Sequence, residues 1–421
     1  MRIVWVKANK ILPVHSGGDI RSFNILRELA VQNELVFLSY YDGPVDETYE
    51  RELQERLPGA VAVSTGRAVG SSVSRGLDYL MTLLNKAPYA VSRFASVKVQ
   101  ERLKRCLGDP RPDAVVCDFL DAAINFPNEV TVPSVLFQHN VESEIWRRHA
   151  ETETNPAKRM VYRLEFKRIL EYEKAALQRF HHVIAVSAHD RELMSGWVDA
   201  SRITVVPTGV DLGQYAPDHS KKELAPLVMF VGAMDWEPNI DAVEYFCHSI
   251  WPAVLAQIPG ARFRIVGRNP DRRVLNCVST SVEVTGRVPS VIEHLREAAV
   301  VVVPLRIGGG TRLKIYEAMA AGKAVVSTSV GAEGLDVHAG QDIILEDSPE
   351  TFADSIVMLL RDAERRKQFE RSAAELAGRY SWKEVGKTFE AVLARISGVG
   401  TRLPAGQFSA AAVRTADRPM A

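Results

Sequence analysis

A glycine loop at residues 308–310 lies between an apolar run and a strongly helical segment in the second half of the chain. This order of strand, glycine loop and helix lets backbone N–H groups approach a phosphate at a helix N-terminus. Arg312 and Lys314 place two cations in the first helical turn, where they oppose the helix dipole, so an anionic ligand is the natural reason for them. Glu317 follows at a position from which a carboxylate can accept hydrogen bonds from sugar hydroxyls. The plainer interpretation is an ordinary turn with surface charges. The loop residues predicted to contact the anion are Gly309, Gly310 and Thr311.

Polar residues also follow several predicted strands, where open α/β sheets place their ligands. Gly17 and Gly18 separate the first strand from the first helix and permit close approach of a ligand. His139 follows an apolar strand directly; its alternative is a hydrogen-bonded core histidine. Arg268 and Arg287 each follow a glycine at a strand end, either as exposed loop cations or as contacts in one shared crevice. None of the glycine groups reads GxGxxG, which disfavours an NAD-dependent dehydrogenase.

Composition restricts the class of protein. The 421 residues contain 52 Lys+Arg and 52 Asp+Glu, so overall charge gives no support to a nucleic-acid partner. The four cysteines form no CxxC pair, which predicts neither a zinc site nor a disulfide framework. The N-terminus reads as a strand and not as a signal peptide, and no apolar run approaches the ~20 residues of a spanning helix. We therefore expect a cytoplasmic protein that is soluble or rests on the inner face of the membrane.

Strand and helix patterns alternate along most of the chain, which predicts parallel sheets covered by helices. We expect an α/β protein with two doubly wound, Rossmann-like domains facing each other across a cleft. The predicted division is an N-terminal domain over 1–207, a linker over 208–226, a second domain over 227–380, a helix over 381–397 and a disordered tail over 398–421.

The segment 71–105 interrupts this alternation with leucines, aromatic residues and seven Lys/Arg against two acidic residues. Such a basic amphipathic segment is suited to an anionic membrane surface. The alternative is a long helical region that packs on the domain with its charges in solvent.

Five motifs in order complete the pattern: VVPTGVDL at 205–212, FVGAMDWEPN at 230–239, IVG at 265–267, TGRVPS at 285–290 and GGGTRLKIYEAMAAGKAVVST at 308–328. Together they resemble the GT-B retaining glycosyltransferases of family 4 (group 1), in particular the bacterial enzymes that build surface and exopolysaccharides. The resemblance covers residues 1–395 and is most specific over 205–335.

The resemblance implies roles for individual residues. Glu317 matches the second Glu of the family's Glu-x7-Glu motif, which holds the donor ribose, and Arg312 and Lys314 would neutralise the donor diphosphate. His139 matches the histidine at the reaction centre. The other matches are Gly17 and Gly18 near the diphosphate and the backbone of Arg287 and Val288 at the base. Gly232 and Arg268, which follow predicted strands, are further candidates for binding the donor. The last helix would cross back onto the N-terminal domain.

Two departures from the family pattern stand out. Gly309 occupies the position of the first motif Glu, and the loop MDWEPN lacks the usual Arg and Lys after the first strand of the second domain. The implied reaction is front-face transfer of a sugar from a nucleotide donor to a glycan or polyprenyl-linked acceptor. It uses no other cofactor, and the lack of an Asp-x-Asp motif predicts no metal requirement. Two other classes stay open: a nucleotide-sugar epimerase, which would convert donor without acceptor, and a silent nucleotide-sugar-binding protein, which would bind without transfer.

Overall fold

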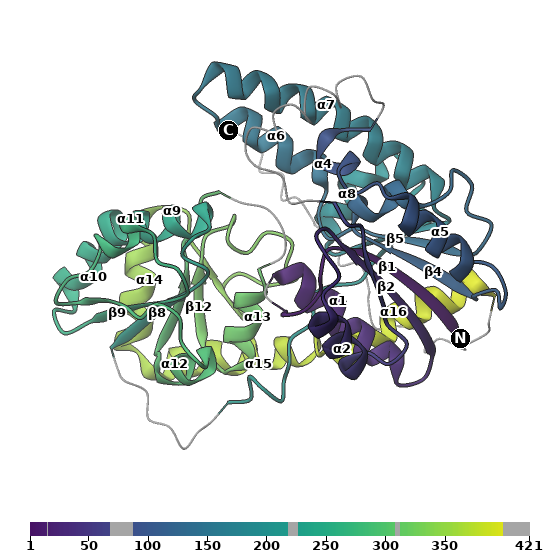
Figure 1. Ribbon diagram of the computed structural model, residues 1–421. Coiled ribbons are helices and arrows are strands. Elements are labelled where there is room, and N and C mark those ends of the chain that lie inside the picture. The colour runs from purple at the N-terminus through teal and green to yellow at the C-terminus, as the bar shows by residue number, and fades with distance from the viewer. Residues whose placement is uncertain (15, 68–86, 218–225, 308–311, 399–421) are drawn as a thin grey trace, which may run out of the picture.

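The computed structural model describes residues 1–14, 16–67, 87–217, 226–307 and 312–398 (Figure 1). Within them, parallel strands form two sheets, one of seven strands in the order β3-β2-β1-β4-β5-β6-β7 and one of six in the order β10-β9-β8-β11-β12-β13. Helices cover both sheets, which confirms the predicted α/β class with two doubly wound sheets (Figure 1). The glycine loop, the tail from 399 onward, residues 71–86 of the basic segment and residues 218–225 of the linker lie outside the described residues.

The N-terminal sheet is built from the strands β1 (Arg2–Ala8), β2 (Glu34–Tyr41), β3 (Val61–Ser64), β4 (Ala114–Asp118), β5 (Ser134–Phe137), β6 (His182–Ala185) and β7 (Ile203–Val205). Its helices are α1 (Gly17–Ala30), α2 (Glu47–Arg56), α4 (Tyr89–Ser92), α5 (Val97–Cys106), the 3-10 helix η1 (Leu120–Asn125), α6 (Glu142–Thr152), α7 (Pro156–Arg179), α8 (Ala188–Ser195) and the 3-10 turn η2 (Ala200–Arg202).

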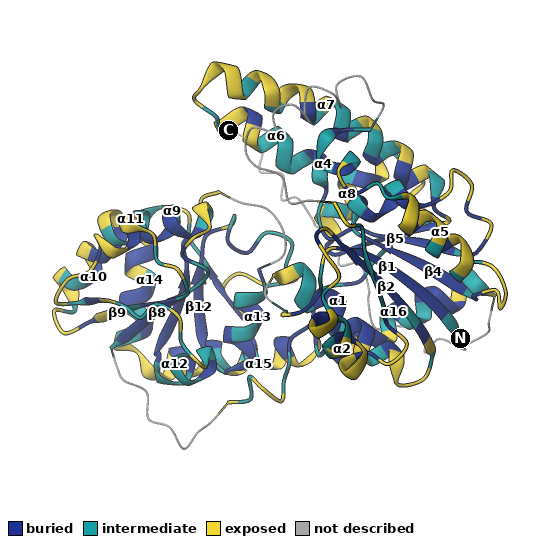
Figure 2. Cartoon of the chain, in the orientation of Figure 1, coloured by how far each residue is buried: buried dark blue, intermediate teal, exposed yellow. Residues whose placement is uncertain are grey.

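Both faces of this sheet are buried, as a parallel sheet requires. On β1, Ile3 and Trp5 point to one face and Val4 and Val6 to the other, following the two-residue period of a strand. The first face packs against α1, α2 and the C-terminal helix, and the second against α5, η1, α7 and α8. Burial therefore follows the sheet strands and the inner sides of the helices (Figure 2).

The second sheet is built from the strands β8 (Leu227–Val231), β9 (Arg262–Val266), β10 (Val282–Val284), β11 (Val300–Val303), β12 (Ala324–Ser327) and β13 (Ile344–Leu345). Its helices are α9 (Glu237–Tyr245), the π-helical turn η3 (Phe246–Ile250), α10 (Trp251–Gln257), α11 (Arg272–Leu275), α12 (Val291–Glu297), α13 (Leu313–Ala320), α14 (Pro349–Arg361) and α15 (Ala363–Gly378).

The chain passes between the two sheets at two adjacent places. After β7 it runs through Thr208 and Gly209, and the Val210 amide donates to the Tyr380 carbonyl at 2.7 Å. Helix α16 (Trp382–Ser397) then returns to the N-terminal sheet, where Phe389 packs on Trp5 with a ring separation of 5.1 Å. The first and last crossings of the chain thus lie side by side.

Several element predictions were wrong or incomplete. The basic segment does not form one helical region in its described part: Pro88 precedes the four-residue α4, and α5 starts only at Val97. Val99 and Leu103 bury one side of α5 in the N-terminal core, as the packed-helix alternative expects. Helix α6 was not predicted, because no side chain of its own caps its start. Instead the Glu173 carboxylate of α7 accepts the Glu142 amide at 2.8 Å.

The packing of α16 on α1 leads to a stability prediction. A Cβ on Gly386 would lie 2.5 Å from the Cβ of Glu28. We expect Gly386→Leu to force the two helices apart and to lower the free energy of unfolding by about 1–3 kcal/mol. Thermal unfolding measures this loss, with the exposed neighbour Lys383→Leu as the control; equal melting temperatures for the two variants would contradict the packing.

Candidate functional site

Lys314 lies in the first turn of α13, as predicted, and is half-buried. Its Nζ donates to Asn239 Oδ1 at 2.9 Å and lies 4.4 Å from the centre of the Phe230 ring. Burial, followed by the repulsion of Arg312, lowers the pKa of Lys314 to about 7, although Glu317 acts in the opposite direction. A binding anion would restore the full charge of this amine.

Arg312 occupies the cap position just before α13, and not the first turn that the sequence predicted. The residue is buried, and its guanidinium lies 5.7 Å from the centre of the Trp236 ring. Burial lowers the pKa of Arg312 to about 10, while the Glu333 carboxylate raises it. Arg312 and Lys314 therefore bring two desolvated cations to one helix start.

Glu317 lies one turn further along α13 and is hydrogen-bonded to the hydroxyl of Tyr215. Burial raises the pKa of Glu317, although Tyr215 and Lys314 counteract it. A carboxylate has about four acceptor positions, so Glu317 can hold Tyr215 and a sugar hydroxyl together. Tyr215, in the segment that joins the domains, was not predicted as a site residue.

The strand ends of the second sheet are held close to each other by glycines. A Cβ on Gly267, after β9, would lie 1.7 Å from the Gly232 carbonyl oxygen, after β8. A Cβ on Gly232 would lie 2.6 Å from the side-chain nitrogen of Asn239, the residue that orients Lys314. Gly232 is thus needed where Asn239 packs, and Asn239 is a positioning residue that sequence reasoning missed.

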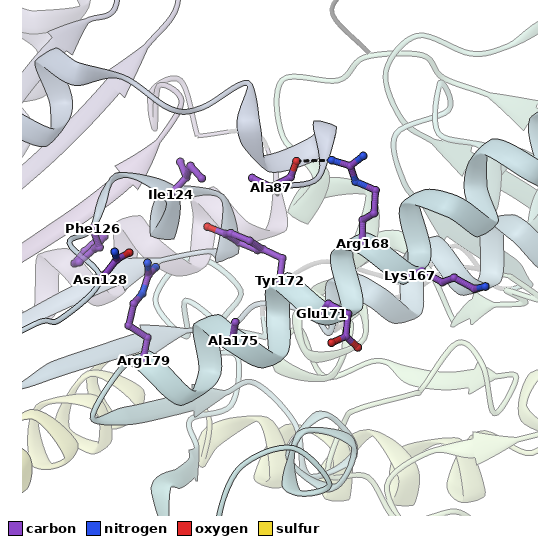
Figure 3. A pocket seen from close by; sticks show the side chains of 10 residues that line it. All are labelled: Ala87, Ile124, Phe126, Asn128, Lys167, Arg168, Glu171, Tyr172, Ala175 and Arg179. Carbon is purple, nitrogen blue, oxygen red and sulfur yellow. Dashed lines mark hydrogen bonds between the residues drawn. The ribbon is translucent and has the colours of Figure 1, made fainter. Parts of the chain in front are cut away.

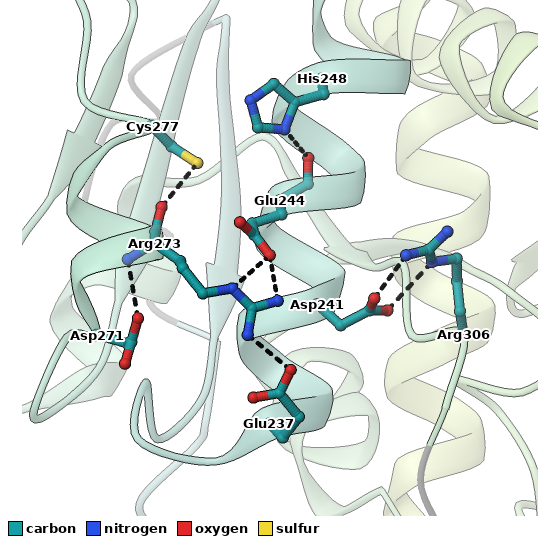
Figure 4. A network of polar contacts seen from close by, with 8 residues as sticks. All are labelled: Glu237, Asp241, Glu244, His248, Asp271, Arg273, Cys277 and Arg306. Atoms are coloured by element: carbon teal, nitrogen blue, oxygen red, sulfur yellow. Dashed lines mark hydrogen bonds and ion pairs between the residues drawn. The ribbon is translucent and has the colours of Figure 1, made fainter. Parts of the chain in front are cut away.

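Ion pairs attach the loop after β11 to α9 (Figure 4). Arg306 contacts Asp241 with both its Nε (3.1 Å) and a terminal nitrogen (2.5 Å). On the other side of α9, Arg273 contacts Glu237 at 2.7 Å and also binds Glu244 (Figure 4). The Arg306 contact holds the segment after β11 against α9, and the Arg273 contacts hold α11 against the same helix.

The remaining predicted residues of this domain follow the neighbouring strands. Arg268 follows β9 and is half-buried, and its carbonyl accepts the Met234 amide at 2.9 Å. Arg287 and Val288 follow β10, the edge strand, and the Arg287 side chain is exposed. Both ends lie at the carboxyl edge of the sheet, but α13 starts after β11, on the far side of β8. The predicted residues Gly309, Gly310 and Thr311 lie outside the described residues.

On the N-terminal side, His139 is the centre of a buried polar network. Its Nε2 lies 2.6 Å from Asp118 Oδ1, and its Nδ1 lies 2.9 Å from an Arg21 terminal nitrogen. Arg21 also donates from Nε to the Thr208 hydroxyl at 2.9 Å. The network links β4, the end of β5, α1 and the start of the crossing between the domains.

The network fixes the protonation of His139. An arginine only donates, so Nδ1 must accept and Nε2–H must donate to Asp118. Burial lowers the pKa of His139 to about 3, which leaves the ring neutral at pH 7. Burial alone would raise the pKa of Asp118, but Lys7 and His139 hold it below its usual value. With both ring nitrogens paired, His139 organises its neighbours and is not a free base.

The start of α1 faces α13 across the domain junction. Gly17 opens α1, and a Cβ there would lie 3.4 Å from a methyl carbon of Leu313. A Cβ on Gly18 would lie 2.4 Å from the Phe119 ring, which itself stacks on His139 at 3.7 Å. The structure therefore brings Gly17, Gly18 and His139 together on one side of the junction and Arg312, Lys314 and Glu317 on the other.

An ion pair that was not predicted spans the same junction. Two Arg148 nitrogens of α6 donate to the two oxygens of Glu333, which follows β12, at 2.9 and 3.2 Å. Next to it, a Cβ on Gly334 would lie 3.2 Å from the Cβ of Ser187. Glu333 also attracts Arg312. Arg148 thus adds a third cation to the junction, from the N-terminal domain.

Two carboxylates near the end of β5 have raised pKa values. Burial raises the pKa of Asp121 to about 6, and burial, followed by Asp121, raises that of Glu142 to about 8. Both residues are half-buried, Asp121 in η1 and Glu142 at the start of α6. Among the residues that the structure describes, no group of three or more His, Cys, Asp or Glu is placed to hold a metal ion. No described helix is long and apolar enough to cross a membrane.

Comparison with known proteins gives two family matches. The profile of "Glycosyl transferases group 1" matches residues 225–362, and that of "Glycosyltransferase Family 4" matches residues 72–214. Both profiles describe glycosyltransferases, and they fall on the two halves of the chain.

Two relatives match half or more of the chain. The phosphatidyl-myo-inositol mannosyltransferase of Mycolicibacterium smegmatis is 28% identical over 221 residues, which are 50% of this chain and 55% of that protein. The chain therefore spans about half the length of this relative. An uncharacterized 44.6 kDa protein in the cps region of Klebsiella pneumoniae is 21% identical over 375 residues, 85% of this chain and 90% of that protein.

Solved structures share the whole fold. Anabaena HepE in complex with UDP superposes with a TM-score of 0.65 at 13% identity, over 94% of this chain and 100% of that one. This likeness shows that the two parallel-sheet domains have the GT-B arrangement.

The buried histidine leads to a prediction about stability and pH. Below about pH 6.5 an unfolded histidine takes up a proton, whereas folded His139 does so only near pH 3. The unfolded state binds more protons in this window, so the free energy of unfolding must fall as the pH falls from 7 toward 4. His182, whose pKa burial lowers to about 4, contributes with the same sign.

We expect His139→Gln to reduce this pH dependence, as measured by denaturant unfolding at a series of pH values. The exposed His248→Gln is the matched control and should keep the wild-type slope. An unchanged slope in His139→Gln would show that the histidine is not buried in the neutral form.

Proposed function

Because the chain belongs to the family 4 (group 1) glycosyltransferases, we propose that it moves a sugar from a nucleoside-diphosphate donor to a hydroxyl of a glycan or lipid-linked acceptor, with retention of configuration. The setting that we propose is surface-polysaccharide synthesis, in the cytoplasm at the inner face of the membrane. The relative in the Klebsiella cps region supports this setting. The complex of HepE with UDP supports a uridine nucleotide as the first donor to test.

One observation carries the proposal: the cations Arg312 and Lys314 lie at the start of α13, with the Glu317 carboxylate one turn further along, opposite the start of α1. The pKa of Lys314 is lowered, and its hydrogen-bond partner Asn239 is neutral. An anion that binds here therefore favours the charged form of the amine and is attracted by it. Glu317, one turn further along α13, offers acceptor positions to a ribose. A nucleoside diphosphate has this order of groups, with the negative charges next to the ribose.

The proposed chemistry asks little covalent work of the protein. The bond between the sugar and the diphosphate breaks, the acceptor oxygen attacks the same face of the sugar, and its proton passes to the departing diphosphate. Arg312 and Lys314 stabilise the charge that develops on the diphosphate. Asp118, His139 and Arg21 keep the opposite wall of the site rigid, which orients the sugar and the acceptor. We propose that no metal ion takes part.

The first test is Lys314→Ala. Loss of one such stabilising group lowers turnover by roughly 10²–10³-fold, and we expect the melting temperature to remain near the wild-type value. Nucleotide release from a UDP-sugar in the presence of acceptor measures the rate, with the exposed Lys367→Ala as the control. Wild-type turnover in Lys314→Ala would refute the assignment.

A second readout comes from the depressed pKa of Lys314. Above pH 7 the free amine is largely neutral, so binding of a diphosphate should take up a proton. Calorimetry of UDP at pH 8 in buffers of different ionisation enthalpy measures this uptake, which Lys314→Ala should abolish.

The second test concerns the carboxylate. We expect Glu317→Ala to weaken binding of the free nucleotide by about tenfold or more, because a charge-assisted hydrogen bond contributes about 1.5–3 kcal/mol. Calorimetric titration with UDP, GDP and ADP measures the affinity and identifies the base. Glu364→Ala, on the exposed face of α15, serves as the control. Equal nucleotide affinities of the wild type and Glu317→Ala would show that Glu317 does not bind the ribose.

A further inference from the structure

The outer face of α7 carries an unusual group of exposed apolar side chains. Met160 is 76% exposed, Leu164 is 42% exposed and Val161 is 40% exposed. They lie near the start of α7, at the tip of the hairpin that α6 and α7 form beside the N-terminal sheet (Figure 1). Much of the hairpin tip is exposed (Figure 2). Leaving three large apolar side chains in water at one place indicates a surface that something covers.

The apolar group continues into a cationic groove along the same helix face. Met160, Leu164 and Lys167 follow one another at intervals of three and four residues, which places them in one stripe of an α-helix. The stripe leads through Glu171 to a groove of about 640 Å³, which Tyr172, the carboxylate of Glu171 and the three cations Lys167, Arg168 and Arg179 line from α7 (Figure 3). Ile124 and Phe126 give the groove an apolar side. We define the α7 face as this apolar group together with the groove.

Charge along this part of α7 is strongly positive. Residues 156–168 contain five Lys/Arg and one acidic residue, Glu165, and Glu165 is buried. Lys158, Arg163 and Lys167 are exposed. The chain as a whole is neutral, so this excess is local to the helix that also presents the apolar group.

We propose that the α7 face docks on an anionic lipid bilayer. Met160, Val161 and Leu164 would enter the boundary between head groups and acyl chains, and Lys158, Arg163 and Lys167 would contact the lipid phosphates. Apolar side chains bordered by cations on a projecting helix meet both requirements of an interfacial surface. Nucleic acid would match only the charge, and a neutral apolar partner would match only the tip.

This proposal names the surface for the membrane contact of the proposed function, and it stands on the α7 face independently of transfer activity. The proposal places the membrane contact on α7 and not on α5. Helix α5 belongs to the described part of the basic segment, and one of its sides is buried in the core. A transferase bound in this way would hold its site beside the bilayer, where a lipid-linked acceptor lies.

The test is co-sedimentation with vesicles of phosphatidylcholine alone and of equal parts phosphatidylcholine and phosphatidylglycerol. We expect the wild type to bind the anionic vesicles and to lose binding as salt is raised. Each of Arg163→Ala and Lys167→Ala should lower the affinity about fivefold, and Met160→Ser/Leu164→Ser should lower it further. Leu275→Ser is the matched control, because Leu275 is 47% exposed on α11 of the other domain.

Equal binding to both vesicle types, or wild-type binding by the α7 variants, would overturn the proposal. A lower melting temperature of Met160→Ser/Leu164→Ser without lipid would also overturn it, because the face would then be covered by the chain itself. If Met160→Ser/Leu164→Ser changed the oligomeric state, the α7 face would instead be a contact with a second copy of the chain. Sugar transfer measured without vesicles separates the membrane proposal from the transferase proposal, because all these variants should retain transfer. A wild type that binds vesicles but transfers no sugar would contradict the transferase proposal and leave the membrane proposal standing.

Discussion

The buried charge of Arg21 is the constraint around which the N-terminal side of the junction is built. Arg21 is 3% exposed and is attracted by the carboxylates of Asp190 and Asp118, and the neutral ring of His139 lies between Arg21 and Asp118. A buried charge without partners costs several kcal/mol, so these groups must assemble together or not at all. Their assembly fixes the ends of β4 and β5 relative to α1 and anchors Thr208, where the chain leaves the domain.

On the other side of the junction, in the second domain, the cation Lys314 has a neutral hydrogen-bond partner. Lys314 is half-buried and, among the described residues, donates to the neutral Asn239, and burial lowers its pKa. Such an arrangement lowers the stability of the protein without ligand and reserves the attraction for an arriving anion. One wall of the site is therefore fully paired and rigid, and the other holds charge that its ligand must neutralise.

The two walls are joined by contacts of different kinds. The crossing segments at Val210 and Tyr380 form a backbone connection that keeps the domains together. Arg148 and Glu333 form a half-exposed ion pair within the junction itself, close in charge to Arg312. Half-exposed pairs are weak and exchange partners easily. A diphosphate entering the junction would therefore compete for cations that now serve the contact between the domains.

The sequence by itself determined the parts of this protein that depend on local pattern. The alternating apolar runs predicted both sheets, and the glycine loop followed by Arg312, Lys314 and Glu317 predicted the helix that carries the candidate site. Only the tertiary structure decided which partners these side chains have. Asn239 reaches Lys314 across 75 positions, Arg21 reaches His139 across 118, and Arg148 reaches Glu333 across 185. Helix α6 escaped prediction for the same reason, since Glu173 caps it from α7. Local propensity extends over a few residues, whereas a buried polar group takes its partner from whichever strand or helix the packing of the core brings beside it.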